Sequence, residues 1–158
     1  MTGVGFFGFV SKPLPPHFKK ILKKVVGLNL KHLDLSEHAE HYGVTSLLII
    51  SDECPNLTHL NISKISTSNY NFVRMVKRCT KLKDLNMSYC SKITDASLTR
   101  LFQNCKDLEN LDITFCHSVT GRCFARANNN LKKLVIDQCE NVSYFKIVFI
   151  LTIQIYQY

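Results

Sequence analysis

The stretch that decides the fold is residues 79–105, CTKLKDLNMSYCSKITDASLTRLFQNC. Leu85 and Met87 lie two positions apart, and such residues point to one side of an extended chain, so they predict a short strand with one buried face. Leu98 and Leu101 have helical spacing. Thr94 and Asp95, just ahead of that pair, are residues typical of a helix N-cap. The stretch therefore predicts a strand, a turn and a returning helix.

The strand motif occurs five times, starting at Leu30, Leu57, Leu82, Leu108 and Leu131. The intervals are 27, 25, 26 and 23 residues, within the range of about 20–29 residues for leucine-rich repeats. One coil buries too little apolar surface to offset the ordering of its own backbone, so neighbouring coils must stack. The pattern predicts an α/β leucine-rich-repeat solenoid, a right-handed β-α superhelix with a parallel concave sheet and convex helices.

Three segments resemble a known class of repeat: CPNLTHLNIS from Cys54, CTKLKDLNMSYCSKITDASL from Cys79 and CKDLENLDITFCHSVTG from Cys105. They are similar to the cysteine-containing leucine-rich repeats of F-box/LRR proteins and of homologues of the antagonist of mitotic exit network protein. The resemblance covers about residues 29–143. It implies a protein-interaction module with a substrate-recognition or adaptor role in SCF-type, ubiquitin-dependent protein degradation, with ubiquitin-ligase components among its partners.

We expect three segments along the chain. Residues 1–29 form a basic N-terminal segment with a capping helix, because Pro15 and Pro16 precede an apolar face with lysines opposite. Residues 30–143 hold the repeats, the fourth of them short, with Phe124 filling its core and Gly121 in a turn. Residues 144–158 form a hydrophobic tail and a truncated last coil, too short to span a membrane. The first strand follows the N-terminal helix too closely for a working F-box.

Composition places the chain in a reducing compartment. Its seven cysteines form no CxxC pair and no even set, and the N-terminus is a poor secretory signal. We expect a cytoplasmic monomer, with the nucleus second and the mitochondrion less favoured. The net charge of +8 comes largely from lysines that precede Asp34. These could meet an acidic partner, nucleic acid or a membrane, but we favour a solvated lysine face and expect no nucleic-acid binding.

The cysteines and histidines show no spacing typical of a catalytic or metal site. The cysteines recur with the coil, which indicates small buried apolar residues rather than zinc ligands. Cys123 lies outside that series and is expected to be the most exposed thiol. The histidines are scattered, and no phosphate loop, nucleophile elbow or HExxH motif is present. We therefore predict no enzyme activity, no cofactor, no metal and no small-molecule substrate.

The candidate binding residues are those expected to point outward from the strands. One column is Asp34, Asn61, Asn86, Asp112 and Val135, and the next is Ser36, Ser63, Ser88, Thr114 and Asp137. Beyond them, Tyr89 and Phe115 occupy equivalent places in neighbouring coils. Aromatic side chains on a polar surface are typical of protein interfaces, although local packing explains the pair equally well. We predict that a protein partner binds this concave face at Asp34, Ser36, Asn61, Ser63, Asn86, Ser88, Tyr89, Asp112, Thr114 and Phe115.

Two alternatives remain for the function. If the basic N-terminal segment is a mitochondrial leader, the chain would be a mitochondrial assembly factor with a leucine-rich-repeat domain. The unusual tail suits a truncated product with no function of its own.

Overall fold

Each predicted strand motif forms a three-residue strand in the computed structural model, which describes residues 29–36, 39 and 46–143. The strands are β1 (His32–Asp34), β2 (His59–Asn61), β3 (Asp84–Asn86), β4 (Asn110–Asp112) and β5 (Lys133–Val135). They make one parallel sheet in chain order, and the central leucines pair in register from Leu33 to Leu134. The sequence register is thus confirmed strand by strand.

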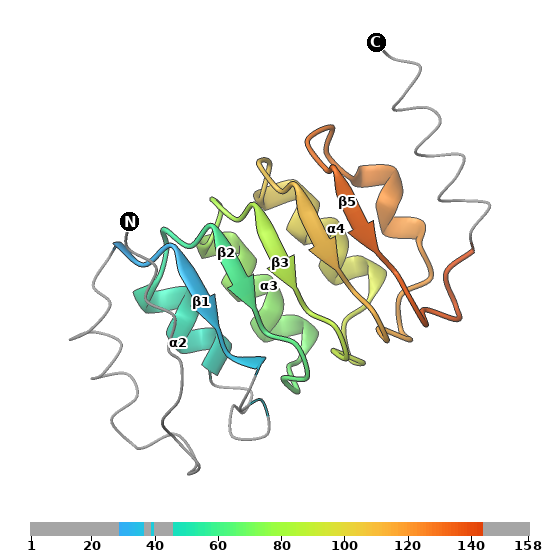
Figure 1. Ribbon diagram of the computed structural model, residues 1–158, viewed down its shortest axis with the longest axis horizontal. Helices are drawn as coiled ribbons and strands as arrows, with labels where there is room; N and C mark the ends of the chain where they lie inside the picture. The colour runs from blue at the N-terminus through green and yellow to red at the C-terminus, as the bar shows by residue number, and fades with distance from the viewer. Residues whose placement is uncertain (1–28, 37–38, 40–45, 144–158) are drawn as a thin grey trace.

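Helical segments connect the strands and cover one side of the sheet (Figure 1). They are α2 (Ser46–Glu53), α3 (Asn69–Arg78), α4 (Asp95–Asn104) and the 3-10 helix η3 (Arg122–Arg126). The helices lie side by side behind the strands, and the first and last described coils occupy opposite ends of the row. The described chain is therefore a β-α repeat with two layers, and one side of its sheet is free of helices. We call that side the sheet face.

The core lies between the two layers. The two inward residues of each strand motif are buried in the first four coils, as are the helical pairs predicted from spacing: Leu47 and Ile50, Phe72 and Met75, Leu98 and Leu101. In the shorter fourth connection, Phe124 is buried and its ring lies 6.2 Å from that of Phe102. Gly121 has a φ of +89°, a conformation that favours glycine. The predicted roles of Phe124 and Gly121 are confirmed.

Thr94 and Asp95 behave differently from the prediction. Thr94 is the N-cap of α4, but its side chain makes no capping hydrogen bond there. Instead its backbone N–H and hydroxyl both donate to Asn69 of the preceding coil, at 3.2 and 3.3 Å. Asp95 accepts from the backbone N–H groups of Thr120 (2.8 Å) and Cys123 (3.0 Å) in the following coil. The predicted N-cap position of Thr94 is therefore confirmed, but the side chains of Thr94 and Asp95 join successive coils.

Two predicted segments lie outside the described residues. These are the N-terminal segment 1–29, apart from Asn29, and the tail 144–158. Within the part that is described, no helix is long and apolar enough to cross a membrane.

The Asp95 contacts predict a stability effect that depends on pH. Burial raises the pKa of Asp95, but the hydrogen bonds from Thr120 and Cys123 outweigh burial and hold it below its ordinary value of 3.8. A lowered pKa in the folded state means that the stabilisation is complete above that ordinary value and is lost as pH falls through the folded-state pKa. We expect Asp95→Ala to lower the free energy of unfolding by about 2 kcal/mol at pH 7, because two backbone donors lose a charged acceptor.

Urea denaturation of wild type, Asp95→Ala and Asp95→Asn between pH 7 and pH 2.5 provides the measurement. The difference between wild type and Asp95→Asn should stay constant down to about pH 4 and shrink below it. A difference that is independent of pH throughout would contradict the role of the carboxylate.

Candidate functional site

Two columns of side chains cross the sheet face, one on each side of the buried central leucines. They line a shallow hollow of about 430 Å³. The first column is His32, His59, Asp84, Asn110 and Lys133, and the second is Asp34, Asn61, Asn86, Asp112 and Val135. Only the second column was predicted from the sequence. The first could have been found by the same alternation, because a residue two positions before Asp34 in a strand points the same way.

The second column is engaged in closing the turns after the strands. In four successive coils its carboxylate or amide oxygen accepts a hydrogen bond from the backbone N–H two residues later. These bonds are Ser36 to Asp34 (2.8 Å), Ser63 to Asn61 (3.1 Å), Ser88 to Asn86 (2.9 Å) and Thr114 to Asp112 (2.9 Å). Short Asx side chains make such turns routinely. In these four coils the Asp or Asn side-chain oxygen therefore stabilises the turn at the end of its strand.

The predicted serine and threonine column is less accessible than expected. Ser63 is 6% exposed and Ser88 is 8% exposed, so the prediction that these two point into solvent is wrong. Ser36 and Thr114 are half-buried. The chain leaves the strand and turns back toward the helices at this position, and the turn tucks the small side chains beneath it.

The first column forms a connected row across four strands. The rings of His32 and His59 stack with centroids 4.0 Å apart and planes within 8°. The Nε2 atom of His59 lies 2.9 Å from a carboxylate oxygen of Asp84, and the amide of Asn110 donates to the other oxygen. The row places imidazole, carboxylate and amide groups in fixed positions on an otherwise open surface, which suits hydrogen bonding to a partner.

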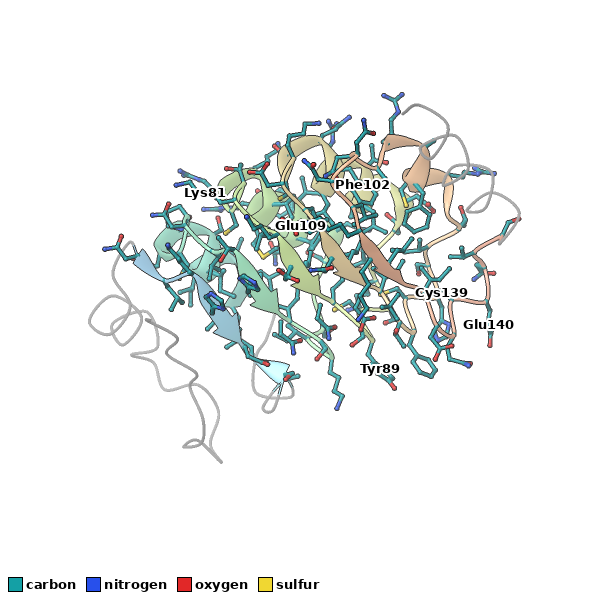
Figure 2. The ribbon with its side chains drawn as sticks, turned by 45° about the horizontal axis from the view of Figure 1, so that its top comes forward. Lys81, Tyr89, Phe102, Glu109, Cys139 and Glu140 are labelled. Carbon is teal, nitrogen blue, oxygen red and sulfur yellow. The ribbon has the colours of Figure 1, made fainter. Side chains whose placement is uncertain are left out.

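Aromatic side chains meet at the edge where the strands end. Tyr89 and Phe115 stack with centroids 4.5 Å apart, and His117 meets Phe115 edge-on at 5.9 Å. Tyr89 is 50% exposed. Figure 2 shows it at the lower edge of the molecule. The predicted adjacency of Tyr89 and Phe115 is confirmed, and we call these three residues the aromatic edge.

The aromatic edge rests on backbone in the left-handed conformation. Lys64, Tyr89, Phe115 and Gln138, at equivalent positions of four coils, have φ between 54° and 65°. Side chains with a Cβ adopt this conformation at a cost of about 1–2 kcal/mol. Inter-coil hydrogen bonds hold it in place, among them Tyr89 N–H to the Thr114 carbonyl at 2.7 Å. At this backbone Tyr89 is half exposed, whereas Ser88 before it is buried.

The cysteines are structural in the described coils. All seven are free thiols and buried, including Cys123 at 1% exposure, so the prediction that Cys123 is the most exposed thiol is wrong. Within the part of the chain that the structure describes, no group of three or more His, Cys, Asp or Glu side chains could hold a metal ion. Burial raises the pKa of Cys79, Cys90, Cys105 and Cys116 to about 12 and that of Cys54 to about 11.

The thiols form two rows of hydrogen bonds to backbone carbonyls of the preceding coil. In one row, Cys79 donates to the Cys54 carbonyl and Cys105 to the Cys79 carbonyl, both at 3.4 Å. Asn128 continues this row with an amide that donates to the Cys105 carbonyl at 3.0 Å. The other row consists of Cys90 to Ile62, Cys116 to Met87 and Cys139 to Ile113.

Comparison with known proteins bears on the fold. No protein-family model matches the chain, and no curated protein matches its sequence. Among solved structures, leiomodin-1 actin-binding site 2 is similar, with a TM-score of 0.62 and 10% sequence identity over 88% of each chain. At that identity the likeness concerns the fold alone. It supports a β-α repeat of the leucine-rich-repeat type.

The left-handed turn predicts a stabilising substitution. Lys64 is exposed and has a φ of 65°, so we expect Lys64→Gly to raise the free energy of unfolding by about 0.5–1 kcal/mol. Lys64→Ala keeps the Cβ and should bring no such gain. Urea denaturation of the three proteins measures both effects. Equal stability of the glycine and alanine variants would show that the turn stores no strain.

The raised thiol pKa values predict a loss of stability at alkaline pH. An unfolded thiol ionises near its ordinary value of 9.0, whereas a buried one resists ionisation, so the free energy of unfolding should fall as pH rises above about 9. The double variant Cys79→Ala/Cys105→Ala should show a shallower fall in urea denaturation between pH 7 and pH 10.5. The native wild type should also not react with an aromatic disulfide reagent at pH 8. Rapid modification without unfolding would contradict this account.

Proposed function

We propose that this chain is a protein-interaction module whose repeats form a leucine-rich-repeat solenoid, with the sheet face as its concave binding surface. The observation that carries the proposal is the stacked pair Tyr89 and Phe115, of which Tyr89 is half exposed although it is a large aromatic residue. Aromatic residues supply much of the binding energy at protein interfaces. The right-handed superhelix expected for such repeats belongs to the same proposal.

The surroundings of the aromatic edge support this function. A partner that covers Tyr89 would also contact the polar hollow, where the row from His32 to Asn110 offers both donors and acceptors. Protein interfaces combine apolar contacts, often aromatic, with polar groups that make hydrogen bonds. The similar leiomodin-1 structure is described as an actin-binding site, so a related fold serves protein binding in that protein.

The cellular role that we propose is substrate recognition or an adaptor function in SCF-type, ubiquitin-dependent degradation. It rests on the resemblance of segments 54–63, 79–98 and 105–121 to F-box/LRR repeats. The seven free thiols support a reducing compartment, and we place the module in the cytoplasm as a monomer. Protein binding and the ligase role are separable, because the first depends on the surface and the second on what the partner brings.

Affinity capture with mass spectrometry tests both parts. Full-length wild type should enrich a defined set of proteins from cytoplasmic extract. The Tyr89→Ala/Phe115→Ala variant should capture at least about tenfold less of these proteins, because aromatic hot-spot residues contribute about 2 kcal/mol or more to binding. Asp107→Ala is the control, since Asp107 is exposed in the turn before β4 and does not line the hollow of the sheet face.

The results separate the two parts of the proposal. Enrichment of cullin-ligase subunits with wild type is expected for the ligase role, and their absence from an otherwise specific set would overturn it. Capture that the double variant leaves unchanged would show that the partner binds elsewhere.

A further inference from the structure

We propose a second docking surface on the opposite side of the molecule, which binds an acidic segment of a partner protein that presents an apolar side chain. This surface is a groove between α3 and α4, and we call it the helix groove. It is distinct from the sheet face and does not depend on the function proposed for that face.

The helix groove is a hollow of about 460 Å³ formed by two neighbouring coils. Its lining residues are Asn69, Tyr70, Val73, Arg74, Lys77, Thr94, Ala96, Ser97 and Arg100. The polar residues at one end, Asn69, Thr94 and Ser97, are bonded to one another across the coils. That network fixes the spacing of the two helices and leaves the charged and apolar residues of the groove for a ligand.

The charge of the groove is positive. Its lining contains Arg74, Lys77 and Arg100 and no carboxylate. Arg74 is paired with Asp52 of α2 at 3.3 Å, and Arg100 donates to the neutral Gln103 at 2.9 Å. Lys77 and Arg100 thus line the groove with no carboxylate beside them in that lining.

The helices on the α4 side of the groove extend this positive character. Helix α3 has no acidic residue and ends in Lys77 and Arg78, and η3 adds the exposed Arg122 and Arg126. On the other side of α3, helix α2 carries Asp52 and Glu53 and no basic residue, and Asp52 is paired with Arg74. The one carboxylate of α4, Asp95, is occupied by Thr120 and Cys123. Carboxylates of a partner would therefore be attracted to this side of the protein.

The groove also has an apolar component. Tyr70 is 72% exposed, the greatest exposure of any large hydrophobic residue that the structure describes, and Val73 and Ala96 lie in the same lining. A ring this exposed gains from being covered by an aliphatic or aromatic side chain. A helix of ten residues is about 15 Å long, so the groove fits a short peptide segment. Lys77 and Arg100 lie beside an apolar wall formed by Tyr70, Val73 and Ala96. This combination suits an acidic peptide with an apolar side chain better than the phosphate backbone of a nucleic acid.

Fluorescence anisotropy with full-length protein and labelled peptides tests this assignment. The probe is EDELEDLEDE, and the comparison peptides replace both leucines by serine or every acidic residue by lysine. We expect the acidic leucine peptide to bind, the serine peptide to bind about fivefold more weakly, and the lysine peptide not to bind wild type. Affinity should fall with added salt.

Charge reversal locates the site. Lys77→Glu/Arg100→Glu should weaken binding of the acidic leucine peptide by about tenfold, as expected for the loss of two surface ion pairs and the addition of repulsion. It should also gain binding of the lysine peptide. Lys31→Glu/Lys64→Glu is the matched control, because it makes the same change in net charge at exposed lysines that line neither the helix groove nor the hollow of the sheet face. It should change affinity less than twofold, and thermal melting confirms that all variants fold.

Several results would overturn the proposal. Equal losses in the two double variants would show non-specific attraction, and equal binding of the leucine and serine peptides would remove the apolar contact. A labelled oligothymidylate that binds more tightly than the peptide, with the same dependence on Lys77 and Arg100, would assign the groove to nucleic acid instead.

Discussion

The structure depends on one requirement, that each coil satisfies the backbone polar groups of the coil beside it. Three-residue strands make few hydrogen bonds of their own, so the pairing continues past them, for example from Leu35 N–H to the Asn61 carbonyl at 2.9 Å. Inside the core, the cysteine thiols add a second hydrogen bond to carbonyls that mostly accept a backbone N–H already. The Ile62 carbonyl, for example, accepts from Ile65 N–H at 3.2 Å and from the Cys90 thiol at 3.4 Å. A thiol is small and apolar enough to be buried while it donates a weak hydrogen bond. Asn128 can replace cysteine in one row because its amide reaches the same carbonyl.

The same requirement produces the aromatic edge. To return from the strand to the helix, the chain must reverse within a few residues and still pair with the next coil. The left-handed residue achieves this, since its own N–H continues the pairing, as in Lys64 to the Ser88 carbonyl at 2.8 Å. Its side chain is then excluded from the interior and emerges beside the equivalent side chain of the neighbouring coil. The placement of Tyr89 beside Phe115 is therefore set by the repeat geometry, and their side chains add the stacking.

Much of the fold could be predicted because periodicity fixes it. The spacing of Leu82, Leu85 and Met87 determines which side chains are inside, and the parallel register from Leu33 to Leu134 follows from aligning the repeats. The errors came where a contact reaches into the next coil or where a turn decides orientation. Thr94 resembles a helix cap within its own coil, yet its donors bond Asn69 one coil earlier. Ser63 would point outward if β2 continued past Asn61, but the strand ends there and Ser63 is buried in the turn that follows. Alternation alone would have given His32 and His59, whereas the stacking of their rings and the contact of His59 with Asp84 required the three-dimensional distances.

The two surfaces of the molecule differ in how their polar groups are already used, and this difference governs how each can bind. On the sheet face, Asp34, Asn61 and Asp84 are held by hydrogen bonds within the protein, so they are ordered before a partner arrives and lose little conformational entropy on binding. Such a surface selects partners by shape and by the few apolar contacts at its edge. On the helix side, Lys77 and Arg100 are exposed cations on long side chains, whose attraction acts over distance and is screened by salt. That surface favours rapid capture of acidic segments with modest selectivity. The two proposed docking surfaces share no residue, so the proposals allow one protein to bind the sheet while a second binds the helices.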